Sequence, residues 1–135
     1  MRLDAGLLAV RLVAGLGMLQ HGWPKIQHAF GWMGPSSPVP GALQALAAVS
    51  EFVGGLALAL GLLTTPAALA VAVTMAVAIF TVHVAQGDPF VRIGPGGSYE
   101  TASLYLVVAL LLLLVGPGRF SLDALLFGRE VVKRS

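Results

Sequence analysis

The sequence predicts an all-α integral membrane protein: a single domain, residues 1–135, folded as an antiparallel bundle of four transmembrane helices. Three observations support this fold class. Of the 135 residues, 57% are hydrophobic and only 10% are charged, whereas a soluble domain carries about 25% charged residues. The mean hydropathy is +0.89. Four apolar stretches approach the roughly 20 residues that a helix needs to cross a bilayer.

The first predicted span covers residues 5–22. Arg11 interrupts its apolar run, and the sequence MLQHGW at residues 18–23 offers no small-residue cleavage site. A secretory signal peptide has both an uninterrupted apolar region and such a site. We therefore expect this first span to be retained.

Three further spans are predicted at residues 43–63, 67–86 and 100–116. Pro66 suits the start of the third helix, where its missing backbone N–H costs no hydrogen bond. The sequence GPG at residues 116–118 ends the fourth helix. The loop between the second and third spans is very short, so these two helices are expected to be antiparallel neighbours.

The distribution of Lys and Arg in the loops predicts the orientation of the chain. Four spans place both termini on one side of the membrane. That side carries five basic residues, and the opposite side carries two, Lys25 and Arg92. The five are Arg2, Arg119, Arg129, Lys133 and Arg134. Both termini are therefore expected to be cytoplasmic.

A short helix is expected to follow the fourth span, at about residues 121–128. Ser121 is a suitable N-cap residue for it, since Ser at this position accepts a backbone hydrogen bond. The segment after Ser121 is amphipathic, as in helices that lie along a membrane surface. We expect it to lie on the cytoplasmic surface.

Ionisable residues inside predicted spans are rare and indicate functional sites by default. Here they are Arg11, His21, Glu51, His83 and Glu100. With a rise of 1.5 Å per residue, Glu51 lies about 18 Å from the cytoplasmic end of its helix, and His21 and His83 lie about 24 Å from theirs. Glu100 begins the fourth helix at the outer end.

Helical spacing predicts that Glu51 points into the bundle, because it shares a face with Gly54 and Gly55, where helices can approach closely. His21, Glu51, His83 and Glu100 thus come from four different helices and lie in the outer half. The alternative is that the histidines lie at the membrane interface and that Glu100 is favoured by the helix dipole.

Three neighbouring residues have open interpretations. Lys25 follows His21 by four residues and shares its face if the helix continues past Pro24. Arg11 either extends to the cytoplasmic surface or reaches toward Glu51. Tyr105, about 140° around its helix from Glu100, is not expected in the same site. Trp23 and Trp32 are assigned to the aromatic belt of the interface.

Several classes of function are excluded by composition. The chain contains no cysteine, which excludes dithiol exchange, iron–sulfur clusters and thiolate metal sites. The net charge of +2 is small, and no basic patch with interleaved aromatic residues is present, so nucleic acid is not expected as a partner. Membrane lipid is the natural environment of this chain.

The pattern R-x3-G-x5-HG-x2-K, formed by Arg11, Gly15, His21, Gly22 and Lys25, resembles the first-helix signature of the DoxX family. The sequence EFVGGLALALG at residues 51–61 is similar to the second-helix motif of that family. The sequence GPGRFSLD at residues 116–123 resembles its C-terminal signature, and His83 and Glu100 fall where related chains often carry polar residues. The resemblance covers nearly the whole chain.

This resemblance implies a small four-helix protein of the bacterial inner membrane. It implies a link to redox chemistry, because the sequence is similar to the membrane subunit of thiosulfate:quinone oxidoreductases. It is also similar to subunits associated with thiol and superoxide defence. The chain carries no nucleotide or flavin motif, so a catalytic protein partner is expected for most redox roles.

The first functional hypothesis is a redox-linked subunit that binds quinone near the outer surface. Glu51, His21 and His83 are the candidate catalytic residues, which would hydrogen-bond the quinone and exchange its protons. Arg11, Lys25 and Glu100 are the candidate cofactor-binding residues.

Three alternatives remain open. The chain could be a non-catalytic assembly or anchoring subunit, with a protein partner or as a homo-oligomer, in which the polar residues only stabilise the bundle. His21 and His83, at equal estimated depth, could ligate one haem or a metal. A small transporter is the fourth possibility, and four spans provide such a pathway only in an oligomer.

Overall fold

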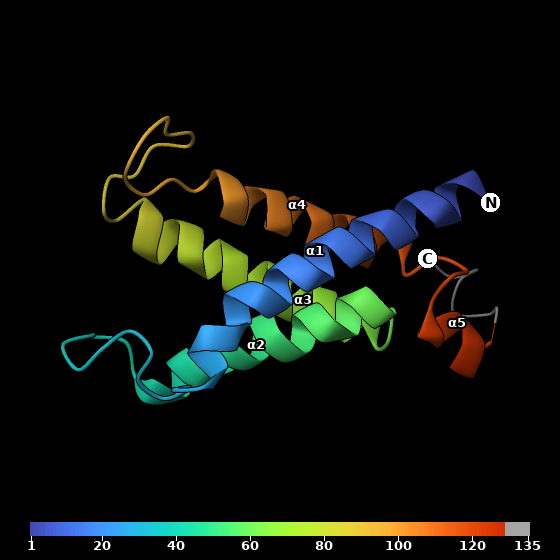
Figure 1. Ribbon diagram of the computed structural model, residues 1–135, viewed down its shortest axis with the longest axis horizontal. Helices are drawn as coiled ribbons and strands as arrows, with labels where there is room; N and C mark the ends of the chain where they lie inside the picture. Colours follow the sequence, from blue (N-terminus) through green and yellow to red (C-terminus); the bar gives the residue numbers. More distant parts are fainter. Residues whose placement is uncertain (129–135) are drawn as a thin grey trace.

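The computed structural model describes residues 1–128, and every regular element among them is helical. The elements are α1 (Arg2–Ile26), α2 (Gly41–Leu60), α3 (Thr64–Val77), the π-helical turn η1 (Ala78–His83), α4 (Glu100–Val115) and α5 (Leu122–Leu126), arranged as in Figure 1. The prediction of an all-α fold is confirmed for this part of the chain.

Three of these helices are long and apolar enough to cross a membrane. They are α1, α2 and the continuous rod formed by α3 and η1, Thr64–His83. The predicted fourth span, α4, is an apolar helix of 16 residues, about 24 Å long at 1.5 Å per residue. It is shorter than the roughly 30 Å hydrocarbon core, so the chain has three or four spans.

The observed helix α1 is longer than the predicted segment 5–22. It contains Pro24 and continues to Ile26. Proline removes a hydrogen bond and crowds the preceding turn, but here only the last turn is affected. His21 and Lys25 therefore lie on one helical face.

The turn between α2 and α3 lies about three residues earlier in the chain than predicted. Helix α2 ends at Leu60 and α3 begins at Thr64. Gly61 ends α2 in the left-handed conformation, with φ of +64°, which glycine adopts without steric cost. Pro66 lies in the first turn of α3, as expected. Leu63 also has a positive φ, 49°, so this turn needs support from elsewhere in the fold.

Helices α1 and α2 pack closely through glycines. A Cβ atom added to Gly15 would lie 2.5 Å from the backbone nitrogen of Ala59, and one added to Gly22 would collide with the backbone of Phe52. The earlier residue of α1, Gly15, thus meets the later residue of α2, Ala59, and Gly22 meets Phe52. The two helices are therefore antiparallel. Small residues at such an interface allow the backbones to approach.

The glycine contacts between α1 and α2, which we call the glycine seam, can be tested with Gly15→Ala. The added methyl group meets backbone rather than a flexible side chain, so we expect the free energy of unfolding in detergent to fall by about 1–3 kcal/mol. Gly6→Ala on the same helix is the control, because nothing lies within 4 Å of a Cβ at Gly6. Alanine's higher helix propensity should leave that variant unchanged or slightly more stable. Equal melting temperatures for the two variants would contradict the close approach.

The two ends of the molecule carry different polar groups. We call the end where α1 finishes, α2 begins and η1 finishes the Lys25 end. The opposite end, where Met1 and α5 lie, is the Asp123 end (Figure 1). Between them the core is apolar, with Met18, Leu58 and Leu112 almost fully buried. Which end faces the cytoplasm stays a prediction, and three of the basic residues that suggest it, Arg129, Lys133 and Arg134, lie outside the described residues.

The predicted helix at residues 121–128 is present as α5, which is shorter (Leu122–Leu126). Ser121 is its N-cap residue, and its hydroxyl accepts a hydrogen bond from the backbone N–H of Ala124 at 3.1 Å. Leu125 and Leu126 are exposed, which gives α5 an apolar face. Its position on a membrane surface stays a prediction.

Candidate functional site

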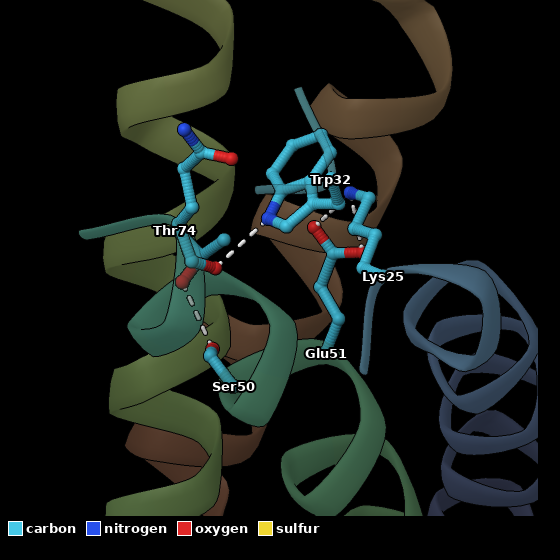
Figure 2. A network of polar contacts seen from close by, with 6 residues as sticks. Lys25, Trp32, Ser50, Glu51 and Thr74 are labelled. Atoms are coloured by element: carbon cyan, nitrogen blue, oxygen red, sulfur yellow. Dashed lines mark hydrogen bonds and ion pairs between the residues drawn. The ribbon is translucent and has the colours of Figure 1, made fainter. Parts of the chain in front are cut away.

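A buried ion pair joins α1 to α2 at the Lys25 end. The Nζ atom of Lys25 donates to both carboxylate oxygens of Glu51, at 2.6 and 2.7 Å. The Glu51 side chain is 4% exposed and that of Lys25 is 25% exposed. Figure 2 shows Glu51 pointing from α2 toward Lys25. The Lys25 side chain is thus the more exposed member of the pair, and the Glu51 side chain is the enclosed one.

The glycine seam places these two side chains together. Gly22 lies directly against the backbone of Glu51 and Phe52, so α1 and α2 are in closest contact here. Lys25 follows Gly22 by three residues and is therefore on a neighbouring part of the same helical surface. The expectation that Glu51 points into the bundle agrees with its burial.

Trp32 covers the ion pair. Its ring lies 4.5 Å from the Lys25 Nζ atom, measured to the ring centroid, a distance at which the cation is attracted to the aromatic face. The Trp32 Nε1–H donates to the backbone oxygen of Gln44 at 2.9 Å. The Gln44 side chain in turn accepts from the N–H of Met33 and donates to the oxygen of Val39. The loop between α1 and α2 is thereby held over the pair.

Beside Glu51, a further polar contact joins α2 to α3. The Thr74 hydroxyl donates to the Ser50 hydroxyl oxygen at 2.9 Å (Figure 2). Ser50 is itself buried. This hydrogen bond satisfies a hydroxyl that would otherwise be buried without a partner.

His21 does not contact the ion pair but packs edge-on against Tyr105 of α4, with ring centroids 5.8 Å apart. Its side chain is exposed. The sequence analysis did not place Tyr105 in the same site as Glu100, and it did not foresee the contact of Tyr105 with His21. The angle between Tyr105 and Glu100 describes only their directions on α4. It does not show which residue of another helix packs against either of them. Gly17 is the signal that could have located Tyr105, because a Cβ there would collide with the Tyr105 hydroxyl.

His83 forms a separate pair with Asp88. The distance from its Nδ1 atom to Asp88 Oδ2 is 2.8 Å, and the side chains are 27% and 13% exposed. His83 lies in the last position of η1, and Asp88 follows in the loop. Sequence reasoning did not identify Asp88. A carboxylate hydrogen-bonded to one ring nitrogen orients the imidazole.

The remaining candidates lie apart from the ion pair. Glu100 is a partly buried residue at the start of α4, and no hydrogen bond or ion pair links its side chain to another residue of 1–128. Arg11 lies at the Asp123 end and is fully buried, where it donates to the backbone oxygen of Phe120. Neither the proposed extension of Arg11 to the surface nor its pairing with Glu51 is observed.

Arg11 instead belongs to a buried polar cluster around Asp123. The Asp123 carboxylate accepts hydrogen bonds from the N–H groups of Leu63 at 2.6 Å and Thr64 at 2.8 Å. The backbone N–H of Asp123 donates to the oxygen of Gly61 at 2.8 Å. The Arg11 guanidinium lies against Gly61, where any Cβ would overlap it. Arg11 thus packs against the α2–α3 turn at Gly61, while its hydrogen bond goes to Phe120.

This arrangement separates the predicted constellation into distinct groups. Lys25 and Glu51 are in contact, His21 is with Tyr105, His83 is with Asp88, and Arg11 is at the far end. Within residues 1–128, no cluster of three or more His, Asp or Glu side chains could hold a metal ion. The Lys25–Glu51 pair under Trp32 is the best candidate site, because it combines a hydrogen-bond donor, a carboxylate and an aromatic surface.

Comparisons with known proteins agree with the resemblance described above. The model of the DoxX family matches residues 6–84, the region from α1 to just beyond η1. An uncharacterized protein of Haemophilus influenzae is 35% identical over 119 residues, which are 87% of each chain. No solved structure matches this chain.

Proposed function

The chain belongs to the DoxX family of membrane proteins, and we propose that it is a redox-linked subunit that binds quinone at its Lys25 end. The Lys25–Glu51 ion pair under Trp32 is the observation that carries this proposal. We further propose that the Lys25 end faces outward from a bacterial inner membrane.

The residues of this site fit the chemistry of a quinone. A quinone has carbonyl oxygens that accept hydrogen bonds and a flat ring. Lys25 has three N–H donors, two of which are directed to Glu51. In this proposal the third donates to an incoming carbonyl. Trp32 provides an aromatic surface next to this donor.

The two charged residues have different roles in this proposal. A bound quinone would supply the redox chemistry by taking up two electrons and two protons to become a quinol. Lys25 would orient a carbonyl oxygen by a hydrogen bond, and the carboxylate of Glu51 would keep the ammonium charged and in place. The two protons of the quinol would come from water at the Lys25 end. The electrons would come from a protein partner, since the chain lacks a nucleotide or flavin motif.

The proposal predicts that Glu51→Gln weakens quinone binding at least about tenfold, which corresponds to about 1.4 kcal/mol. The Lys25 ammonium would lose the charge that holds it in position. Binding of decylubiquinone to the purified protein can be measured by titration, together with the quinone that co-purifies. Glu100→Gln is the control, because Glu100 begins α4 at the same end and is partly buried.

Wild-type protein without quinone affinity would overturn the proposal, as would equal affinities for wild type and Glu51→Gln. A visible spectrum of the same preparation tests the haem alternative. A Soret band that disappears in His21→Ala and His83→Ala would favour haem over quinone as the ligand.

A second candidate function, an anchoring subunit of a larger membrane complex, is supported by one observation. Both Glu51 oxygens are already bonded by Lys25, as expected for an ion pair whose role is to hold α1 against α2. In this case Glu51→Gln lowers the yield of folded protein while a stoichiometric partner still co-purifies. Quinone affinity is then absent from the wild type as well.

A further inference from the structure

An apolar groove lies between α1 and α4. Its volume is about 470 Å³, and its walls include Val10, Val13 and Ala14 of α1 and Thr101, Leu104 and Tyr105 of α4. The two helices cross and then diverge toward the Lys25 end (Figure 1). The volume falls within the range of roughly 300–1,000 Å³ of small-molecule sites.

The groove is polar at one end only. Thr101 and Tyr105 lie in the first two turns of α4, near the Lys25 end, and the other walls are aliphatic. Tyr105 packs against His21, which precedes Lys25 by one helical turn. Tyr105 therefore both lines the groove and contacts His21, the residue one turn before Lys25 on α1.

We infer that this groove receives the hydrocarbon tail of the quinone, which enters laterally from the bilayer between α1 and α4. The ligand class would then be a long-chain membrane quinone rather than a tail-less soluble one. This inference rests on the proposed function. It adds that Tyr105 is the residue at which the tail leaves the groove and the head turns toward Lys25.

Two features favour such a tail over other occupants. The groove extends along only about two turns of each helix, which is short for the interface with a helix of a second copy. Its walls carry no charged side chain, so nothing there would neutralise a phospholipid phosphate. Val13 is 76% exposed and Leu104 is 62% exposed, which leaves the groove open to lipid.

The test is to fill the groove with Val13→Trp. This position is exposed, so the larger side chain enters the groove without disturbing the core. We expect the affinity for decylubiquinone to fall about tenfold, while the affinity for the tail-less parent benzoquinone stays unchanged. Leu104→Trp, from the other wall, should act in the same way. Val73→Trp is the control, since Val73 is 55% exposed on α3.

Other outcomes would overturn the inference. Val13→Trp could weaken both quinones equally or neither of them. It could instead release a tightly bound phospholipid, detected by mass spectrometry, or convert a dimer into a monomer, with quinone binding unaffected. Failure of the proposed function itself is distinguishable, because the wild type would then bind neither the tailed nor the tail-less quinone.

Discussion

Replacement of Lys25 with methionine is expected to lower the free energy of unfolding by about 3–5 kcal/mol. Glu51, 4% exposed in the wild type, would lose its counter-charge and both hydrogen bonds while staying enclosed by Trp32 and the α1–α2 seam. Thermal unfolding in mild detergent measures the effect. Arg2→Met is a suitable control, because Arg2 is an exposed cation on the same helix.

The double variant Lys25→Met/Glu51→Leu separates structural from chemical roles of the pair. Replacing both members of a buried ion pair by apolar residues is often neutral or stabilising, so we expect most of the lost stability to return. Quinone affinity should stay lost, because the donor and the carboxylate are both absent. If affinity returns together with stability, the pair has no chemical role in binding.

The second large effect is expected for Asp123→Leu at the opposite end, about 3–5 kcal/mol, because two N–H groups lose a charged acceptor and each such loss costs about 1–3 kcal/mol. This change removes the acceptor for the N–H groups of Leu63 and Thr64. The turn at Leu63, with its positive φ, would lose its support at the start of α3.

Asp4→Asn is the matched control for this experiment. Asp4 also accepts a backbone hydrogen bond at the Asp123 end, from the N–H of Arg119, but the contact is at the exposed rim, where such bonds contribute little. We expect a small change in melting temperature. Equal losses in both variants would show that the Asp123 cluster has no special role.

The Asp123 variant also tests the place of Arg11. Because Arg11 lies at the end remote from Lys25 and Glu51, folded Asp123→Leu protein at low temperature should keep wild-type affinity for decylubiquinone. A selective loss of affinity would return Arg11 to the candidate binding residues.

Much of the fold could be predicted from the sequence because a bilayer imposes strict rules on it. Apolar length predicts spanning helices, and the GPG sequence at residues 116–118 marks the end of the fourth helix through local backbone chemistry. The second span was predicted to run to residue 63, past Gly61, which ends α2 in the structure. Pro24 was harder to interpret, because a proline can end a helix or be accommodated in its last turn. The observed helix continues to Ile26, and this places Lys25 beside Glu51.

The candidate site was less accessible to sequence reasoning. Depth along a helix follows from residue number, but two side chains at equal depth can face different neighbours. His21 and His83 have the same estimated depth, yet one packs on Tyr105 and the other on Asp88. Trp32, assigned only to an interface, covers Lys25 because hydrogen bonds between its loop and Gln44 of α2 hold it there.

By itself the sequence determined the helical membrane character of this protein and the burial of Glu51, since both depend on local apolar content and on the cost of a charge among small residues. Only the tertiary structure decided the partners: Lys25 for Glu51, and Asp123 for the turn beside Arg11. Those pairings depend on the close approach of α1 to α2 at Gly22 and on the return of the chain after α4. Such contacts join residues far apart in the chain, and no local pattern encodes them.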